Sequence, residues 1–179
     1  MENKVLNIAE YNPVSSDLFF FDNNVWMFLF CPLGEHQYHK QQLYSRFLQE
    51  VLAVNAPIFI NDLVLSEFSN TYFRLDFHQF ALQQNRPVVY KKNYVGTSRY
   101  QRIASDIRHA IDDILQIARH SDQSINTLGL TNVLSNIEHI DFNDSFYIEQ
   151  AKAGNWKIVT DDRDFQKVAH QIPIITKMD

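Results

Sequence analysis

Short apolar runs of three to five residues alternate along this chain with longer segments that carry apolar residues at steps of three or four. The runs cover residues 18–21, 58–60, 157–160 and 172–176. Runs of this length, rich in Phe, Ile and Val, are typical of buried strands, and the longer segments are typical of amphipathic helices. Strands that alternate with helices favour a parallel sheet covered on both faces. We therefore expect an α/β fold, with a short central parallel sheet in a three-layer α/β/α arrangement.

The helical segments follow the runs in a regular order. The first is expected to start at Asn24 with an amide cap and to stop at 32–34, where Pro32 and Gly34 interrupt it. The others are expected at 36–54, 63–83 after an Asn61–Asp62 cap, 98–120 with Ser98 as the cap, 144–152 and 161–169. Residues 85–97 are expected to form a loop, and 121–141 a mixture of short helix and loop.

Length and composition favour one globular domain. The chain has 179 residues, of which 45% are hydrophobic and 13% aromatic, so we expect a single domain over 1–179 with its core at about 17–177. Cys31 is the single cysteine, which excludes a disulfide within the chain and fits a reducing, cytoplasmic location. Residues 1–17 lack the apolar stretch of a signal peptide, and no run approaches the ~18 apolar residues of a membrane span. No membrane partner is expected.

Charge is distributed unevenly. The net charge is −5, yet no acidic residue lies between Asp76 and Asp106. That stretch contains the cations Arg86, Lys91, Lys92, Arg99 and Arg102, interleaved with Tyr90, Tyr94 and Tyr100. A basic, aromatic stretch in an acidic protein is able to guide a polyanion locally. The alternative interpretation is a solvated loop with ordinary lysines.

Acidic residues recur where a run gives way to a helical segment. They are Asp22, Glu67, Asp144, Asp161, Asp162 and Asp164. In open α/β folds, ligands bind beyond the carboxyl ends of the strands, so these side chains are candidates for one site. Two unit charges about 4 Å apart repel by roughly 4 kcal/mol at an effective dielectric of about 20. Convergence therefore implies raised pKa values or bound cations, and oxygen-only ligands favour Mg²⁺ or Mn²⁺. As the alternative, Asp22, Asp62 and Asp144 each serve only as helix caps, and Glu67 lies on a solvated helix face.

Four stretches together resemble the PIN-domain ribonucleases, the family of the VapC-like toxins and their relatives. They are "FFFDNNVWMFLF", "LVLSEFSN", "FNDSFYIEQAKAGNWKIVTDDRDF" and "IPIIT". The positions that match the family pattern are Asp22, Asn24, Val25, Ser66, Glu67, Asp144, Ala151, Gly154, Thr160, Asp162, Asp164 and Phe165. The likeness spans residues 18–176, although 70–143 match only in helical character. Asn23 departs from the family pattern, which usually has a small hydroxyl residue there.

The resemblance implies a PIN-like fold and a metal-dependent endoribonuclease that cleaves single-stranded or looped RNA with a metal-activated water. It implies that Asp22, Glu67, Asp144 and Asp162 are catalytic and hold one or two Mg²⁺ or Mn²⁺ ions, with Asp164 as a further ligand. Asn24 and Thr160 would orient these ligands. Lys91, Lys92, Arg99 and Arg102 are the weaker candidates for RNA contact. The resemblance also allows for a cognate antitoxin, which would make the chain the toxin of a type II toxin–antitoxin pair, and for a homodimer.

Other functions remain open from the residues alone. The fold would also serve as a catalytically inert module that binds RNA or protein, although all four acidic positions are filled. A phosphoacceptor receiver domain needs a lysine after its last core strand, for which Lys177 is the one candidate. A phosphatase with an aspartate nucleophile needs Asp-x-Asp at the first strand, where this chain has Asp22-Asn23-Asn24. The seven histidines are scattered and show no metal-ligand pattern.

Overall fold

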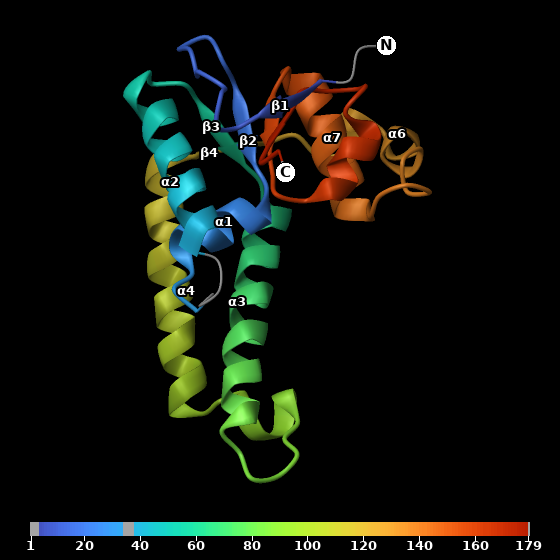
Figure 1. Cartoon of the computed structure of the whole chain (residues 1–179). Coiled ribbons are helices and arrows are strands. Elements are labelled where there is room, and N and C mark those ends of the chain that lie inside the picture. The colour runs from blue at the N-terminus through green and yellow to red at the C-terminus, as the bar shows by residue number, and fades with distance from the viewer. Residues whose placement is uncertain (1–3, 34–37, 179) are drawn as a thin grey trace.

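A parallel sheet forms the centre of the protein in a computed structural model that describes residues 4–33 and 38–178 (Figure 1). Within those residues the sheet has six strands in the order β1-β6-β5-β2-β3-β4, and every pairing is parallel. The strands are β1 Val5–Asn7, β2 Phe19–Phe21, β3 Ile58–Ile60, β4 Arg119–His120, β5 Lys157–Val159 and β6 Ile174–Thr176. The expected short parallel sheet is therefore confirmed.

The three phenylalanines of β2 show how the layers are built. All three are fully buried, and successive side chains of a strand point to opposite faces. Phe19 and Phe21 pack on Phe47 of α2, with ring centroids 5.8 and 6.2 Å apart, whereas Phe20 packs on Tyr147 of α7 at 5.1 Å. A strand that is buried on both faces has a continuous run of apolar residues, which explains why β2 is easily recognised in the sequence. The three-layer α/β/α arrangement is confirmed.

Helices surround the sheet and connect its strands. They are α1 Asn23–Phe30, α2 Tyr38–Ala53, α3 Asp62–Leu82, the π-helical turn η1 Tyr90–Tyr94, α4 Ser98–Ile117, α5 Ile125–Leu128, α6 Leu130–Leu134, α7 Phe142–Gly154 and the 3₁₀ turn η2 Arg163–Val168. The expected helix at 36–54 begins at Tyr38, and its first two positions lie outside the described residues. Figure 1 shows α3 and α4 side by side as a long arm that extends away from the sheet and carries η1 at its end. None of the helices in the described ranges is long and apolar enough to cross a membrane.

Several local expectations were wrong, and each has a physical reason. Helix α1 is capped by Asp22 and α4 by the Thr97 hydroxyl, one or two residues before the caps expected at Asn24 and Ser98. Helix α4 ends at Ile117, and the two residues expected to end it form the edge strand β4 instead. The exposed Arg and His of β4 carry no apolar signal, and the half-buried β1 has only two apolar residues in succession, Val5 and Leu6. The expected loop at 85–97 contains η1.

Candidate active site

Two neighbouring strands deliver acidic residues to the same edge of the sheet. Strand β2 ends just before Asp22, and its neighbour β5 ends just before Thr160, Asp161 and Asp162. The chain runs from β2 to β3 on one side, whereas β5 leads to β6 on the other. The order of the sheet therefore reverses between β2 and β5, which is where open α/β sheets bind their ligands.

Asp22 is buried, and both of its carboxylate oxygens accept hydrogen bonds from neutral donors. Its Oδ1 accepts the backbone N–H of Asn23 at 2.6 Å, which caps α1. Its Oδ2 accepts Asn24 Nδ2 at 2.5 Å and Thr160 Oγ1 at 2.7 Å. A carboxylate oxygen has two lone pairs, so Oδ1 keeps one for a further ligand. Asn24 and Thr160, the residues expected to orient ligands, thus both contact Asp22.

The loop after β5 is held from α1 and α2. Asn24 Oδ1 accepts the backbone N–H of Asp161 at 3.0 Å, and Tyr44 donates its hydroxyl to the Thr160 carbonyl at 3.0 Å. Lys40 Nζ pairs with Asp161 Oδ2 at 2.6 Å. Asp161 is therefore used to fix the loop, and the next acid, Asp162, lies exposed at the site with its Oδ1 accepting the backbone N–H of Asp164.

Glu67 reaches the site from the second turn of α3. Tyr147 of α7 donates its hydroxyl to Glu67 Oε2 at 3.1 Å. Burial, together with the nearby charges of Glu67 and Asp22, raises the pKa of Tyr147, so its proton stays in place as a donor. This contact joins α3 to α7 across the site and overturns the interpretation of Glu67 as a freely solvated side chain.

Asp144 completes the cluster from the first turn of α7. The cap of that helix is Asp141, whose Oδ1 accepts the backbone N–H of Asp144 at 2.9 Å, so Asp144 has no capping role. Burial raises the pKa of Asp144 to about 8, and the charges of Asp22, Asp141, Asp162 and Glu67 add to the rise. Burial likewise raises the pKa of Asp22 to about 7, with contributions from Glu67 and Asp162, although hydrogen bonds from Thr160 and the Asn23 backbone oppose it.

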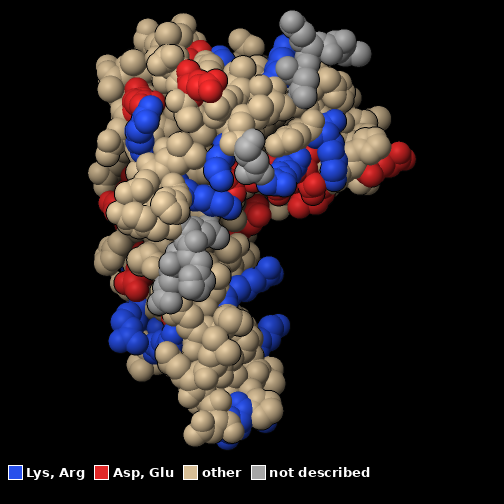
Figure 2. Space-filling view, viewed as in Figure 1, with Lys and Arg blue, Asp and Glu red and all other residues tan. Residues whose placement is uncertain are grey.

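The four expected catalytic acids therefore lie within reach of one another's charges. Within residues 4–33 and 38–178, however, no three His, Cys, Asp or Glu side chains come close enough together to enclose a metal ion. Asp164 is exposed, and its carboxylate pairs with Lys167 at 2.7 Å. Figure 2 shows acidic side chains gathered in the hollow where the arm meets the body, and basic ones along the arm.

The arm places the four basic candidates in different surroundings. Lys91 and Lys92 are exposed in η1, and Arg102 is exposed on α4. Arg99 instead forms a two-pronged pair with the buried Asp76, with both N–O distances 2.8 Å. Roughly 20–25 Å of helix separates Glu67 from the C-terminal end of α3, at a rise of about 1.5 Å per residue. A molecule that contacts both the acids and η1 must span that distance.

Three contributors to the site were not anticipated. Tyr147 follows Asp144 by three residues, a spacing that puts both on one helix face, so the pattern "DSFY" contained a signal. Lys40 and Tyr44 carry no comparable signal, because their partner Asp161 lies more than a hundred residues away.

Comparison with known proteins decides the family. The sequence pattern of the PIN domain family matches residues 19–171. The chain belongs to the PIN-domain family. The fold of this PIN domain is similar to that of a chain in the crystal structure of VapBC2 from Rickettsia felis bound to a DNA fragment from their promoter, with a TM-score of 0.55. The two are 17% identical over 89% of this chain and 98% of that chain, so the likeness concerns the fold. No curated protein matches this sequence.

PIN domains are generally nucleases that depend on divalent metals. The side chains of this PIN domain fit such an ion by their chemistry. Asp22, Glu67, Asp144 and Asp162 offer only oxygen, which Mg²⁺ and Mn²⁺ prefer. Burial, together with the neighbouring carboxylates, raises the pKa of Asp22 and Asp144 and so disfavours their charged forms, which a bound cation would stabilise. Asp22 also retains a lone pair for coordination.

Proposed function

We propose that this PIN domain is an Mg²⁺- or Mn²⁺-dependent endoribonuclease that cleaves single-stranded or looped RNA. The observation that supports it is that four acids from four segments lie within reach of one another's charges, which adds to the effect of burial in raising the pKa of Asp22 to about 7 and of Asp144 to about 8. Such an arrangement costs stability without a cation, and it lies at the edge of the sheet where ligands bind.

Asp22, Glu67, Asp144 and Asp162 would hold one or two ions. A divalent ion bound there supplies an activated water and neutralises charge that develops at the phosphate. We assign the direct contacts to these four residues, because Asp164 pairs with Lys167 and would act through water. Family precedent implies in-line attack and a product with a 5′-phosphate.

The remaining residues keep these acids in position. Asn24 and Thr160 together restrict the Asp22 carboxylate to one orientation, since both hydrogen-bond the same oxygen. Tyr147 does the same for Glu67. Carboxylates that are already held in position lose little conformational entropy when they bind a cation. Removing a residue that hydrogen-bonds a metal ligand commonly lowers metal affinity or activity about 10–100-fold.

RNA contact would extend along the arm. Lys91, Lys92 and Arg102 are exposed and would bind phosphates, whereas Arg99 would act indirectly by keeping the arm folded. An RNA that reaches η1 from the acids spans on the order of seven nucleotides, at about 3.4 Å per nucleotide along a helical strand.

The partners follow from the same proposal. The similar fold in VapBC2 belongs to a two-component complex. By analogy, we propose that this chain is a toxin that acts in the cytoplasm and has a cognate antitoxin. We also propose that the chain is able to form a homodimer. Co-expression with the product of an adjacent small reading frame, followed by size-exclusion chromatography with light scattering, tests both assemblies.

Cleavage itself is tested with mixed RNAs incubated in EDTA, Mg²⁺ or Mn²⁺, followed by analysis of the product ends. We expect cleavage in Mn²⁺ or Mg²⁺ with 5′-phosphate ends, and none in EDTA or with Asp22→Asn. The matched control is Asp112→Asn, an exposed aspartate on α4. Cleavage that persists in the Asp22→Asn variant would contradict the proposal. An inert binding module would bind neither ion tightly by calorimetry.

A further inference from the structure

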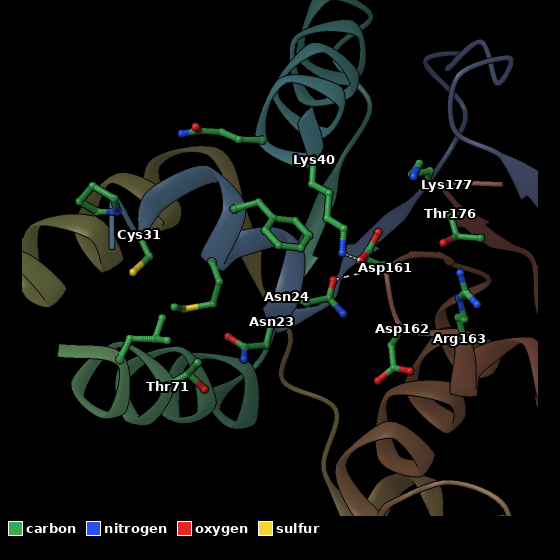
Figure 3. A pocket seen from close by; sticks show the side chains of 15 residues that line it. Asn23, Asn24, Cys31, Lys40, Thr71, Asp161, Asp162, Arg163, Thr176 and Lys177 are labelled. Atoms are coloured by element: carbon green, nitrogen blue, oxygen red, sulfur yellow. Dashed lines mark hydrogen bonds and ion pairs between the residues drawn. The ribbon is translucent and has the colours of Figure 1, made fainter. Parts of the chain in front are cut away.

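A cavity of about 810 Å³ opens beside the acidic cluster, between α1, α3 and the loop after β5 (Figure 3). Its apolar side is formed by Met27, Phe28 and Leu75, and its rim by the charged residues Lys40, Asp162 and Arg163. Cavities of about 300–1,000 Å³ suit small organic groups. Asp162 belongs both to this cavity and to the acidic cluster, so a group in the cavity lies next to the proposed cut site.

Asn23 is the unusual side chain in this cavity. It is only 7% exposed, yet its Oδ1 has no hydrogen-bond partner among the described residues. Figure 3 shows its side chain in the cavity near Thr71 of α3, on the opposite side from Asp161. The neighbouring amide of Asn24 differs, because its nitrogen donates to Asp22 and Thr160 and its oxygen accepts the backbone N–H of Asp161. A buried amide oxygen without a partner is uncommon, and a ligand that donates a hydrogen bond to it would account for it.

An amide presents a donor and an acceptor in one plane, as the edge of a nucleobase does. Asparagine pairs with base edges through two hydrogen bonds, and unstacked bases of single-stranded RNA expose those edges. The apolar wall formed by Met27 and Leu75 would receive the flat face of the ring. Thr71 lines both this cavity and a smaller hollow of about 290 Å³ that is also lined by Glu67 and Arg74, so the two hollows are adjacent.

We propose that this cavity binds the nucleobase next to the scissile phosphate, and that Asn23 determines which base is accepted. This rests on the proposed nuclease function. It predicts that the wild-type protein cuts a randomised single-stranded RNA library in Mn²⁺ with about a tenfold preference at one position flanking the cut, which is the discrimination that one good amide–base pairing provides.

Sequencing the product ends for wild type, Asn23→Ala and Asn23→Leu tests the assignment. Both variants should flatten the preference to less than about twofold, whereas Asn126→Ala, an exposed control on α5, should keep it. Neither Asn23 variant should lower the melting temperature, because the Asn23 side-chain oxygen has no hydrogen-bond partner in the described part of the chain. A lower melting temperature with an unchanged base profile would identify Asn23 as a structural residue and overturn the proposal.

A second measurement separates this proposal from the nuclease itself. Binding of the four nucleoside monophosphates to the full chain, by competition or calorimetry, should show one base preferred about tenfold, and Asn23→Ala should remove that preference. If the protein cuts no RNA but binds one nucleotide selectively, the nuclease proposal fails and the assignment of the cavity stands. If wild type and Asn23→Ala cut with the same base profile, the assignment fails and the cavity is left to a protein partner.

Discussion

Replacing Asp76 with asparagine should destabilise the arm, because Asp76 is the buried hydrogen-bond acceptor that joins α3 to η1 and α4. Asp76 is 3% exposed on α3. It accepts Arg99 Nε and Nη2, both at 2.8 Å, and the Tyr94 hydroxyl at 2.7 Å. Tyr94 is itself fully buried among the rings of Phe77, Phe80 and Tyr100. One carboxylate thus joins α3, η1 and α4.

The magnitude follows from burial. Removing one partner of a buried ion pair costs about 3–5 kcal/mol, because the other charge is left without compensation. The Arg99 side chain is 22% exposed and the substituted asparagine would keep one acceptor oxygen, so the cost should lie at or somewhat below the lower end of this range. We expect Asp76→Asn to lower the free energy of unfolding by about 2–3 kcal/mol, or the melting temperature by about 4–12 °C for a chain of this length.

The pH dependence has a definite sign. Burial favours the neutral acid, but hydrogen bonds from Arg99 and Tyr94 outweigh it and hold the pKa of Asp76 below its usual value. A lowered pKa means that the pair stabilises the fold above the unfolded value near 3.8 and that this stability is lost as pH falls through the folded pKa. The difference in the free energy of unfolding between wild type and Asp76→Asn should therefore be largest at pH 7 and should decrease in more acidic buffer.

Urea unfolding of wild type, Asp76→Asn, Arg99→Met and the double variant measures the pair directly. We expect a coupling energy above about 1.5 kcal/mol. The control is Glu50→Gln, which breaks the exposed Arg46–Glu50 pair and should change stability by no more than about 0.5 kcal/mol. A coupling energy below about 0.5 kcal/mol, or a stability difference between wild type and Asp76→Asn that does not change with pH, would refute the reasoning.

Three further predictions concern the site and the arm. Asp22→Asn should reduce RNA cleavage by roughly a thousandfold or more and abolish the tight Mn²⁺ binding that calorimetry measures. The circular dichroism spectrum should not change, because an asparagine at this position still caps α1. A loss of helical signal would show that the capping role of Asp22 dominates. Tyr147→Phe should reduce activity about 10–100-fold by freeing Glu67 while its ring still packs on Phe20, and full activity would exclude the positioning role. Lys91→Ala and Lys92→Ala should each lower the salt slope of RNA binding by about 1 without affecting Mn²⁺ affinity; unchanged slopes would place the RNA elsewhere.

The sheet was predictable where strands are buried on both faces. Phe19–Phe21 and Ile58–Ile60 carry a dense apolar signal, and the structure has strands at both. The edge strands β1 and β4 gave no such signal, since they are half-buried or exposed and are stabilised by backbone pairing to β6 and β3. Backbone hydrogen bonds do not depend on side-chain type, so composition does not reveal them.

The acidic residues of the site were predictable from the sequence, but the residues that hold them in position were not. Acids that follow strands are visible in the sequence, because the carboxyl ends of parallel strands share one edge. Lys40 and Tyr44 were not visible, because their contacts with the loop after β5 depend on where α2 packs. The basic stretch was ambiguous for a related reason: Arg99 and Lys91 look alike in sequence, and burial of Asp76 alone separates a structural cation from an exposed one.

Helix capping and ligand binding compete as explanations for an acid at a helix start, and the structure separates them residue by residue. Asp22 caps α1 through one oxygen and still has a lone pair, so the two roles coexist there. Asp144 has no capping role, because Asp141 fills it, yet burial raises the pKa of Asp144 to about 8 and the charges of the neighbouring acids add to the rise. A carboxyl group whose charged form is disfavoured by its surroundings, and which does not cap its own helix, is a candidate for binding a cation. Asp144, more than Asp22, is therefore the residue that argues for a cation at this site.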